Sequence, residues 1–102
     1  MTHRRIRTAL NAEFEVGARR GRGKICNVAE GGLFVGTTEL PDQGELVSLS
    51  FRDHRGRPLD VHGLVWWTTG EAPPGAHRMP GFGMRLIEDS EEFSHFFASL
   101  AG

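Results

Sequence analysis

The 102 residues of the chain suit one domain around one small hydrophobic core, and a composition of 38% hydrophobic and 25% charged residues excludes a disordered or fibrous protein. No stretch approaches the ~20 consecutive apolar residues of a membrane span, and no apolar run follows the basic N-terminus as in a signal peptide, so we expect no membrane insertion. The net charge is −1, and the chain beyond its basic N-terminal region is negative, which disfavours DNA as a partner. The single cysteine, Cys26, lacks a partner for an internal disulfide, as is typical of a cytoplasmic protein.

Three strands are predicted in the first third of the chain, and the first of them shows alternation of apolar and polar residues. The first strand spans 10–16 and is followed by a glycine-rich turn over 17–23, which closes a hairpin onto a second strand over 24–29. Residues 30–32 break that strand, and a short apolar run over 33–35 is the third strand. The face of the first strand that we expect in the core is formed by Leu10, Ala12, Phe14 and Val16.

Three more strands are predicted over 47–51, 59–67 and 82–86. Short turns rich in Gly, Pro and Asp precede the first two, and a Gly- and Pro-rich loop over 68–80 precedes the third. Within the middle strand, the alternation predicts Trp67 in the core and Trp66 outside. The outer indole either packs under the C-terminal helix, which we favour, or stacks on a ligand.

The C-terminal segment changes its period to that of an amphipathic helix, which we expect over 89–101. Asp89 with Glu92 resembles a capping box, and the apolar stripe consists of Phe93, Phe96, Phe97 and Leu100. The simplest surface on which this stripe can be buried is an open end or side of the sheet. Six short antiparallel strands predict a barrel or a sandwich. We favour an all-β barrel, expected over 9–88, because closure removes exposed strand edges.

Catalysis is the function that the residues support least. The five histidines are scattered without the spacing of metal ligands, and a lone strand cysteine is more often an apolar packing residue than a nucleophile. The sequence has no nucleophile elbow and no P-loop, and Gly81-Phe82-Gly83 is better explained as a strand passing under a bulky neighbour. We therefore expect no enzymatic activity, no metal and no cofactor.

The charge distribution indicates an anionic ligand near the N-terminus. Residues 1–24 carry seven basic and two acidic residues, a net +5, whereas the remainder carries five basic and eleven acidic residues, a net −6. A solvated basic arm explains this asymmetry equally well. Three arginines, in an arm over 1–8 that we expect to be flexible, are suited to fork onto phosphate and stack on a purine: Arg4, Arg5 and Arg7.

A second candidate feature is the turn between the second and third strands, Asn27-Val28-Ala29-Glu30-Gly31-Gly32. An asparagine side chain has both an acceptor and two donors, which suits the edge of a nucleobase. Gly32 permits close backbone approach or a positive φ. Taken alone, a tight connection between two strands is the simpler explanation of this stretch.

Over almost its full length, the chain resembles the PilZ family. Basic residues precede the first strand, as in the family's Arg-x-x-x-Arg motif, and Asn27-x-Ala29-x-x-Gly32 is similar to the family's Asp/Asn-x-Ser-x-x-Gly turn. The family order continues with Gly63-Leu64-Val65-Trp66-Trp67 and then with Gly81-Phe82-Gly83-Met84-Arg85. The resemblance implies a single domain over 1–102, a six-stranded antiparallel PilZ-type β-barrel with one C-terminal helix.

The resemblance also implies a ligand, because PilZ domains are typically receptors for cyclic di-GMP, a bacterial second messenger with two phosphates and two guanines. By this resemblance, phosphates are held by Arg4, Arg5 and Arg7, and a guanine edge is bound by Asn27, Ala29, Gly31 and Gly32. The sequence departs from the family twice. If Arg7 is the second arginine of the motif, His3 replaces the first, and Ala29 replaces the serine.

We therefore expect a cyclic di-GMP receptor or adaptor in bacterial second-messenger signalling, with an unidentified effector protein as its downstream partner. Loss of the serine hydroxyl removes about 1 kcal/mol of ligand binding, and exchange of an arginine fork for a mostly neutral histidine removes as much or more. The two departures leave an alternative open. It is a degenerate PilZ domain that does not bind cyclic di-GMP and acts through protein–protein contacts, for example in motility.

Overall fold

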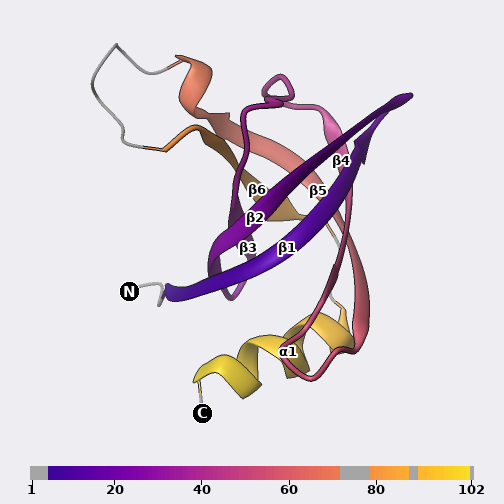
Figure 1. Cartoon of the computed structure of the whole chain (residues 1–102), viewed down its shortest axis with the longest axis vertical. Helices are drawn as coiled ribbons and strands as arrows, with labels where there is room; N and C mark the ends of the chain where they lie inside the picture. Colours follow the sequence, from indigo (N-terminus) through magenta and orange to yellow (C-terminus); the bar gives the residue numbers. More distant parts are fainter. Residues whose placement is uncertain (1–4, 72–78, 88–89, 102) are drawn as a thin grey trace.

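Each of the six strands pairs with two neighbours, and together they close an antiparallel barrel in the order β1-β2-β3-β6-β5-β4 (Figure 1). The computed structural model describes residues 5–71, 79–87 and 90–101. Its elements are β1 (Ile6–Val16), β2 (Arg19–Ala29), β3 (Gly32–Gly36), β4 (Leu46–Arg52), β5 (Pro58–Thr68), the short 3₁₀ helix η1 (Thr69–Glu71), β6 (Gly81–Leu86) and α1 (Glu91–Ala101). The predicted fold class, an all-β barrel with one C-terminal helix, is confirmed.

The interior of the barrel is a packed hydrophobic core. Alternate residues of the strands point inward, and those that are at most 5% exposed include Phe14, Ile25, Leu49, Val61 and Phe82. The rings of Phe14 and Phe82 meet edge to face with centroids 5.2 Å apart. Because side chains fill the interior, a nucleotide-sized ligand has to bind on the outside of the barrel wall.

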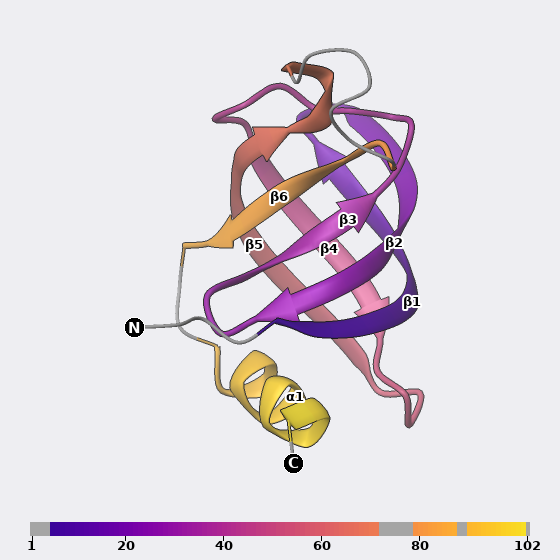
Figure 2. The ribbon, with the colours of Figure 1, turned by 90° about the vertical axis from the view of Figure 1, so that its left-hand side faces the viewer.

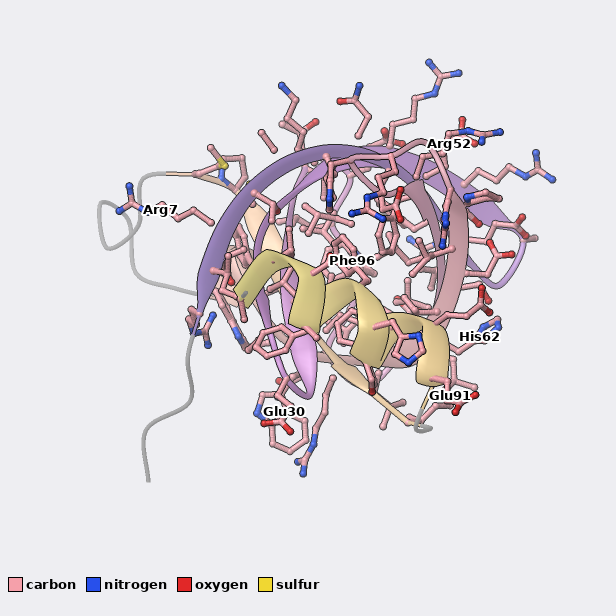
Figure 3. All side chains as sticks on the ribbon, turned by 90° about the horizontal axis from the view of Figure 1, so that it is seen from below. Arg7, Glu30, Arg52, His62, Glu91 and Phe96 are labelled. Carbon is pink, nitrogen blue, oxygen red and sulfur yellow. The ribbon has the colours of Figure 1, made fainter. Side chains whose placement is uncertain are left out.

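Helix α1 crosses one open end of the barrel (Figure 2). Phe96 points from the helix into the barrel (Figure 3), and its ring centroid lies 5.2 Å from that of Phe51. The helix begins at Glu91, and Ser90 caps it, because the Ser90 Oγ accepts a hydrogen bond from the Phe93 N–H at 3.1 Å. The predicted capping residue Asp89 lies outside the described residues. Neither α1 nor any other helix in the described ranges is long and apolar enough to cross a membrane.

The first hairpin turns over two residues only, so the predicted glycine-rich turn over 17–23 is wrong beyond residue 18. Gly17, with φ of 61°, makes the turn, and β2 already begins at Arg19. Gly21 and Gly23 lie within the strand, where a Cβ would stand 2.4 Å from the Phe14 ring and 2.6 Å from the Gly36 carbonyl oxygen, respectively. These two glycines make room for tight packing of the wall rather than for a turn.

The prediction that Trp67 is buried is also wrong. The pairing of β5 with β6 shifts by one residue between Val65 and Trp67, and this bulge interrupts the inward–outward alternation. Val65 stays inside, at 1% exposed, whereas Trp66 and Trp67 are 54% and 40% exposed on the outer surface. The ring of Trp66 is covered by the guanidinium of Arg85 rather than by the C-terminal helix.

Strand β1 begins at Ile6, earlier than the expected boundary between the arm over 1–8 and the barrel. Ile6 lies opposite Val28 on β2, and Thr8 donates a hydrogen bond from its Oγ1 to the Ile25 carbonyl at 2.6 Å. A bulge between Arg7 and Leu10 separates this first stretch of the ladder from the rest. The early start places Arg7 on the barrel wall.

Candidate functional site

Three of the predicted ligand residues meet on the outer surface of the β1–β2 pair. Arg7 lies opposite Asn27 in the ladder, and Arg5, just before β1, donates a hydrogen bond from Nη1 to Asn27 Oδ1 at 3.1 Å. Figure 3 shows Arg7 pointing outward from the barrel wall. Arg5 and Arg7 are exposed and Asn27 is half-buried, so this arginine cluster presents positive charge beside an amide on an open surface.

Bulges in two strand pairs turn these side chains outward. The β1–β2 register shifts between Arg7 and Leu10, and the β2–β3 register shifts between Ile25 and Asn27. Ile25 and Val28 are both fully buried, so the two residues between them, Cys26 and Asn27, are both directed away from the core. An extra residue in one strand redirects side chains in this way. Asn27 is thereby placed beside the arginines.

The remaining predicted turn residues have different surroundings. A Cβ on Gly32 would stand 2.2 Å from the Met84 carbonyl oxygen, so this glycine is required for the close approach of β3 to β6. Its φ is not positive. At Gly31, by contrast, a Cβ would meet nothing within 4 Å, and the residue is exposed. Gly31 therefore offers space to a ligand, whereas the close approach expected at Gly32 is made by the protein's own backbone.

Ala29 lies opposite Gly32 where β2 turns into β3, and it is half-buried. It lies two residues beyond Asn27 on the same strand, so its methyl group stands where the family serine would place a hydroxyl. The exposed carboxylate of Glu30 follows at once and brings negative charge to this edge of the site. Arg4 lies outside the described residues.

The other described arginines of the N-terminal region belong to ion pairs. The three pairs are Arg19–Glu45 at 2.9 Å, Arg20–Glu15 at 3.6 Å and Arg22–Glu13 at 3.7 Å. Within the described part of the chain, no carboxylate lies within 4.0 Å of the Arg5 or Arg7 guanidinium. The described arginines of this region therefore divide into a compensated group, Arg19, Arg20 and Arg22, and an uncompensated group, Arg5 and Arg7, and only the second lies beside Asn27.

Sequence reasoning missed a second outer surface, which follows β6. The exposed large hydrophobic residues of the described ranges all lie on β5, at the ends of β6 or on neighbouring β4: Leu46, Trp66, Trp67, Met79 and Ile87. The Arg85 side chain lies among them, with its guanidinium carbon 4.8 Å from the centre of the Trp66 ring. We call these five residues and Arg85 the β6 patch.

Glycines of β6 allow this patch to form. Trp67 stacks on Phe34 with ring centroids 5.3 Å apart and an interplanar angle of 23°. A Cβ on Gly83 would stand 2.2 Å from the Trp67 indole nitrogen, and a Cβ on Gly81 would stand 2.5 Å from the Phe34 ring. The prediction that Gly81-Phe82-Gly83 passes under a bulky neighbour is confirmed, and the two neighbours are aromatic rings on the outer surface.

The comparison with protein families decides the identity of this barrel, because residues 1–100 match the family model of the PilZ domain. The chain belongs to the PilZ family. Among solved structures, the Bacillus subtilis inhibitor of motility (MotI/DgrA) has a similar fold, with a TM-score of 0.77 and 14% sequence identity over 99% of this chain. The chain spans about half of that protein, 49% of its length. No curated protein sequence gives a significant match.

In this PilZ barrel, the arginine cluster and the β6 patch adjoin. Asn27 lies opposite Phe34 in the β2–β3 ladder, and Phe34 lies opposite Gly83 in the β3–β6 ladder. Trp67 is the partner of Gly83 on the other side. A ligand that contacts Asn27 therefore has Phe34 as its next neighbour along the wall, and beyond it Trp67 of the patch, which stacks on Phe34.

Among residues 5–71, 79–87 and 90–101, no three His, Cys, Asp or Glu side chains converge as a metal site requires. Cys26 is a free thiol whose Sγ lies 3.5 Å from the Sδ of Met79. Its place beside a thioether, on the rim of the β6 patch, agrees with the predicted role in packing.

Proposed function

We propose that this PilZ domain is a receptor for cyclic di-GMP that serves as a non-enzymatic adaptor in the bacterial cytoplasm. The observation that carries the proposal is the arrangement of Arg5 and Arg7 around Asn27, on an open surface and without a carboxylate partner among the described residues. PilZ domains typically bind this nucleotide, which has two negatively charged phosphates. The uncompensated cations and the amide match its two kinds of polar group.

The donors of the cluster are suited to phosphate oxygens. A guanidinium has five N–H donors in a fixed fork, and one donor of Arg5 forms the hydrogen bond to Asn27. The remaining donors of Arg5 and those of Arg7 are available for bidentate contacts, each worth about 1.5–3 kcal/mol because both partners are charged. Arg4 is the third phosphate ligand in this proposal.

The amide of Asn27 is suited to a guanine. Its Oδ1 accepts the hydrogen bond from Arg5, which leaves the two Nδ2 N–H donors for an acceptor on the ligand. The O6 and N7 atoms of guanine are acceptors side by side on one edge of the base. Asn27 is thus proposed to bind the base, with Ala29 and Gly31 lining the turn and Gly32 holding the turn against β6.

Isothermal titration with cyclic di-GMP at moderate salt tests the proposal. Wild type is expected to bind at low-micromolar concentration or tighter. The double variant Arg5→Ala/Arg7→Ala is expected to lose about 100-fold or more in affinity, since two charge-assisted contacts disappear. The matched control is Arg20→Ala/Arg22→Ala, which removes the same charge from the compensated group and is expected to change affinity less than about threefold. Equal losses in both double variants would refute the role of the cluster.

A second candidate function is favoured by one observation, the methyl group of Ala29 in place of a hydroxyl. Here the protein is a degenerate PilZ domain that does not bind the nucleotide and acts by docking onto another protein. The similar Bacillus subtilis structure is an inhibitor of motility, so motility is one setting for such docking. Absence of both heat and a thermal shift at about 100 μM nucleotide would favour this function, since a bound ligand raises the melting temperature.

A further inference from the structure

We propose that the β6 patch is a docking surface for a partner-protein segment that carries apolar side chains and a carboxylate. The patch collects the exposed large hydrophobic residues of the described ranges on one side of the barrel, with Leu46, Trp66 and Met79 each more than half exposed. Scattered single apolar residues are normal on a protein surface, whereas a contiguous group marks an interaction site. This inference goes beyond the receptor function and does not depend on nucleotide binding.

The closed barrel restricts how a partner can bind. At the patch, β6 is paired on both sides, with β3 over residues 81–85 and with β5 over residues 82–86, so it has no open edge to pair with the backbone of another chain. A partner therefore has to bind through side chains on the outer wall. On β6 these side chains are large and apolar, which gives a partner a surface to bury.

The aromatic side chains of the patch are held in place before any partner arrives. Trp67 is fixed between the backbone of Gly83 and the ring of Phe34, and Trp66 lies against the Arg85 guanidinium. Preorganised side chains lose little rotamer freedom on binding, so the entropy cost that opposes the favourable contacts with a partner is small. Tryptophan and arginine are also the residue types that most often dominate binding energy at interfaces.

The positive charge of Arg85 indicates that the partner segment carries a carboxylate. Arg85 is the one charged member of the patch, and none of the three ion pairs between described residues involves it. Its guanidinium lies over the ring of Trp66, where the apolar ring would partly desolvate a carboxylate from a partner. A second copy of the chain is a poorer occupant, because a two-fold contact across this surface brings Arg85 toward its own copy.

A phage-displayed library of random 12-residue peptides, selected against the full chain without nucleotide, tests the proposal. The expected result is enrichment of peptides that combine Leu, Phe or Trp with Asp or Glu. A synthetic peptide of the enriched sequence should bind Arg85→Ala at least tenfold more weakly than wild type. Its affinity for the matched control Arg22→Ala should be unchanged. With Arg85→Glu as the target, the selection should turn to peptides with Lys or Arg.

The fluorescence of the protein provides an independent readout. The sequence has two tryptophans and no tyrosine, so nearly all emission excited at the tryptophan band comes from the patch. Addition of the enriched peptide should shift the emission of wild type. Trp66→Phe keeps an aromatic ring in place and guards against loss of the fold, and in this variant the remaining shift reports on Trp67.

Several results would overturn the proposal. They are no enriched peptide, peptides that bind Arg85→Ala and wild type equally, enrichment of basic rather than acidic peptides, or a sedimentation profile of wild type that shows self-association through the patch. Nucleotide binding is measured in a separate experiment, in which cyclic di-GMP is titrated into wild type and into Arg85→Ala. The receptor function and the docking surface can therefore be refuted independently. If Arg85→Ala abolishes nucleotide binding and no peptide is enriched, the patch is part of the ligand site and not a docking surface.

Discussion

Side chains on the outer surface of β1, β2 and β4 meet as opposite charges and hydroxyls, whereas those on β3, β6 and the end of β5 meet as aromatic rings over glycines. On the first face, Glu13 lies between Arg22 and Ser50 on the two neighbouring strands. On the second face, Trp67 and Phe34 cover Gly83 and Gly81. The first arrangement tolerates change, because water replaces any lost contact. The second arrangement requires glycine under the rings, because a Cβ at these positions would clash with them, so it tolerates few substitutions.

The largest effect is expected from Gly32→Ala, which tests whether the close approach of β3 to β6 on this second face depends on glycine. Its Cβ would stand 2.2 Å from the Met84 carbonyl oxygen, so β6 has to move, and we expect a loss of about 2–3 kcal/mol in the free energy of unfolding. Gly31→Ala is the matched control, since a Cβ there meets nothing within 4 Å, and it should change stability by less than about 0.5 kcal/mol. Urea denaturation of both variants measures the difference. Similar losses would contradict the steric argument.

A smaller effect is expected from Trp67→Ala, which removes the ring that covers Gly83. The lost stacking on Phe34 and the newly exposed apolar surface should lower the free energy of unfolding by about 1–2 kcal/mol. Trp66→Ala removes only a partly exposed contact with Arg85, so its loss should be about 0.5 kcal/mol. Thermal and chemical unfolding of the two variants should rank them in this order. The reverse order would mean that Trp66, not Trp67, is the structural member of the pair.

Two carboxyl groups outside the aromatic face should make stability depend on acid. The pKa of Glu45 is lowered by the Asp42 backbone N–H and by Arg19, and the pKa of Asp53 is lowered by the backbone N–H groups of Arg57 and Arg55. Since the folded protein binds these protons less readily than the unfolded chain, the stabilisation is present above the ordinary values of 4.5 and 3.8. It is lost as the pH falls through the lower folded values.

The double variant Glu45→Gln/Asp53→Asn should therefore show a flatter decline of stability below roughly pH 4.5 than wild type. Unfolding in urea at a series of pH values between neutral and strongly acidic measures both profiles. Parallel profiles would show that other carboxyl groups carry the acid dependence.

The smallest effect is expected on the charged face. A double-mutant cycle on Arg20 and Glu15, which lie 3.6 Å apart and are both largely exposed, should give a coupling below about 0.5 kcal/mol. The coupling should vanish in ~1 M salt, where exposed charges are screened. A coupling above about 1 kcal/mol would mean that contacts on the charged face stabilise the barrel about as much as those on the aromatic face, which would contradict the comparison.

The strands and the core were predictable because they depend on short-range alternation. Phe14, Leu49 and Val61 lie inside as their pattern requires. The errors arise where one residue type has several uses or where a strand gains a residue. Glycine makes a turn at Gly17 and a packing gap at Gly21, and the sequence alone does not distinguish the two.

The candidate site was predictable only in part. The motif residues Arg5, Arg7 and Asn27 lie together, as the resemblance implied, but the pairing of the hairpin arginines depends on a strand register that no local pattern reveals. The β6 patch was missed because the bulge after Val65 reverses the expected orientation of Trp67. A signal was present in the sequence nonetheless. Two adjacent tryptophans, together with glycine at alternate positions of the last strand, indicate rings lying over a bare backbone.

The aromatic cover over β6 has a consequence for how the barrel opens. Phe82 and Met84 seal the inner side of this strand, and Trp67 and Phe34 shield its outer side, so water is kept from its backbone on both sides. Its amide hydrogens should therefore exchange among the slowest in the protein. The β1–β4 ladder, by contrast, joins Ala12–Glu15 to 48–51 under a hydrated surface, so we expect this strand pair to separate first. Opening of the barrel should begin at this ladder, while the strand pairs that carry the arginine cluster and the aromatic part of the patch stay together.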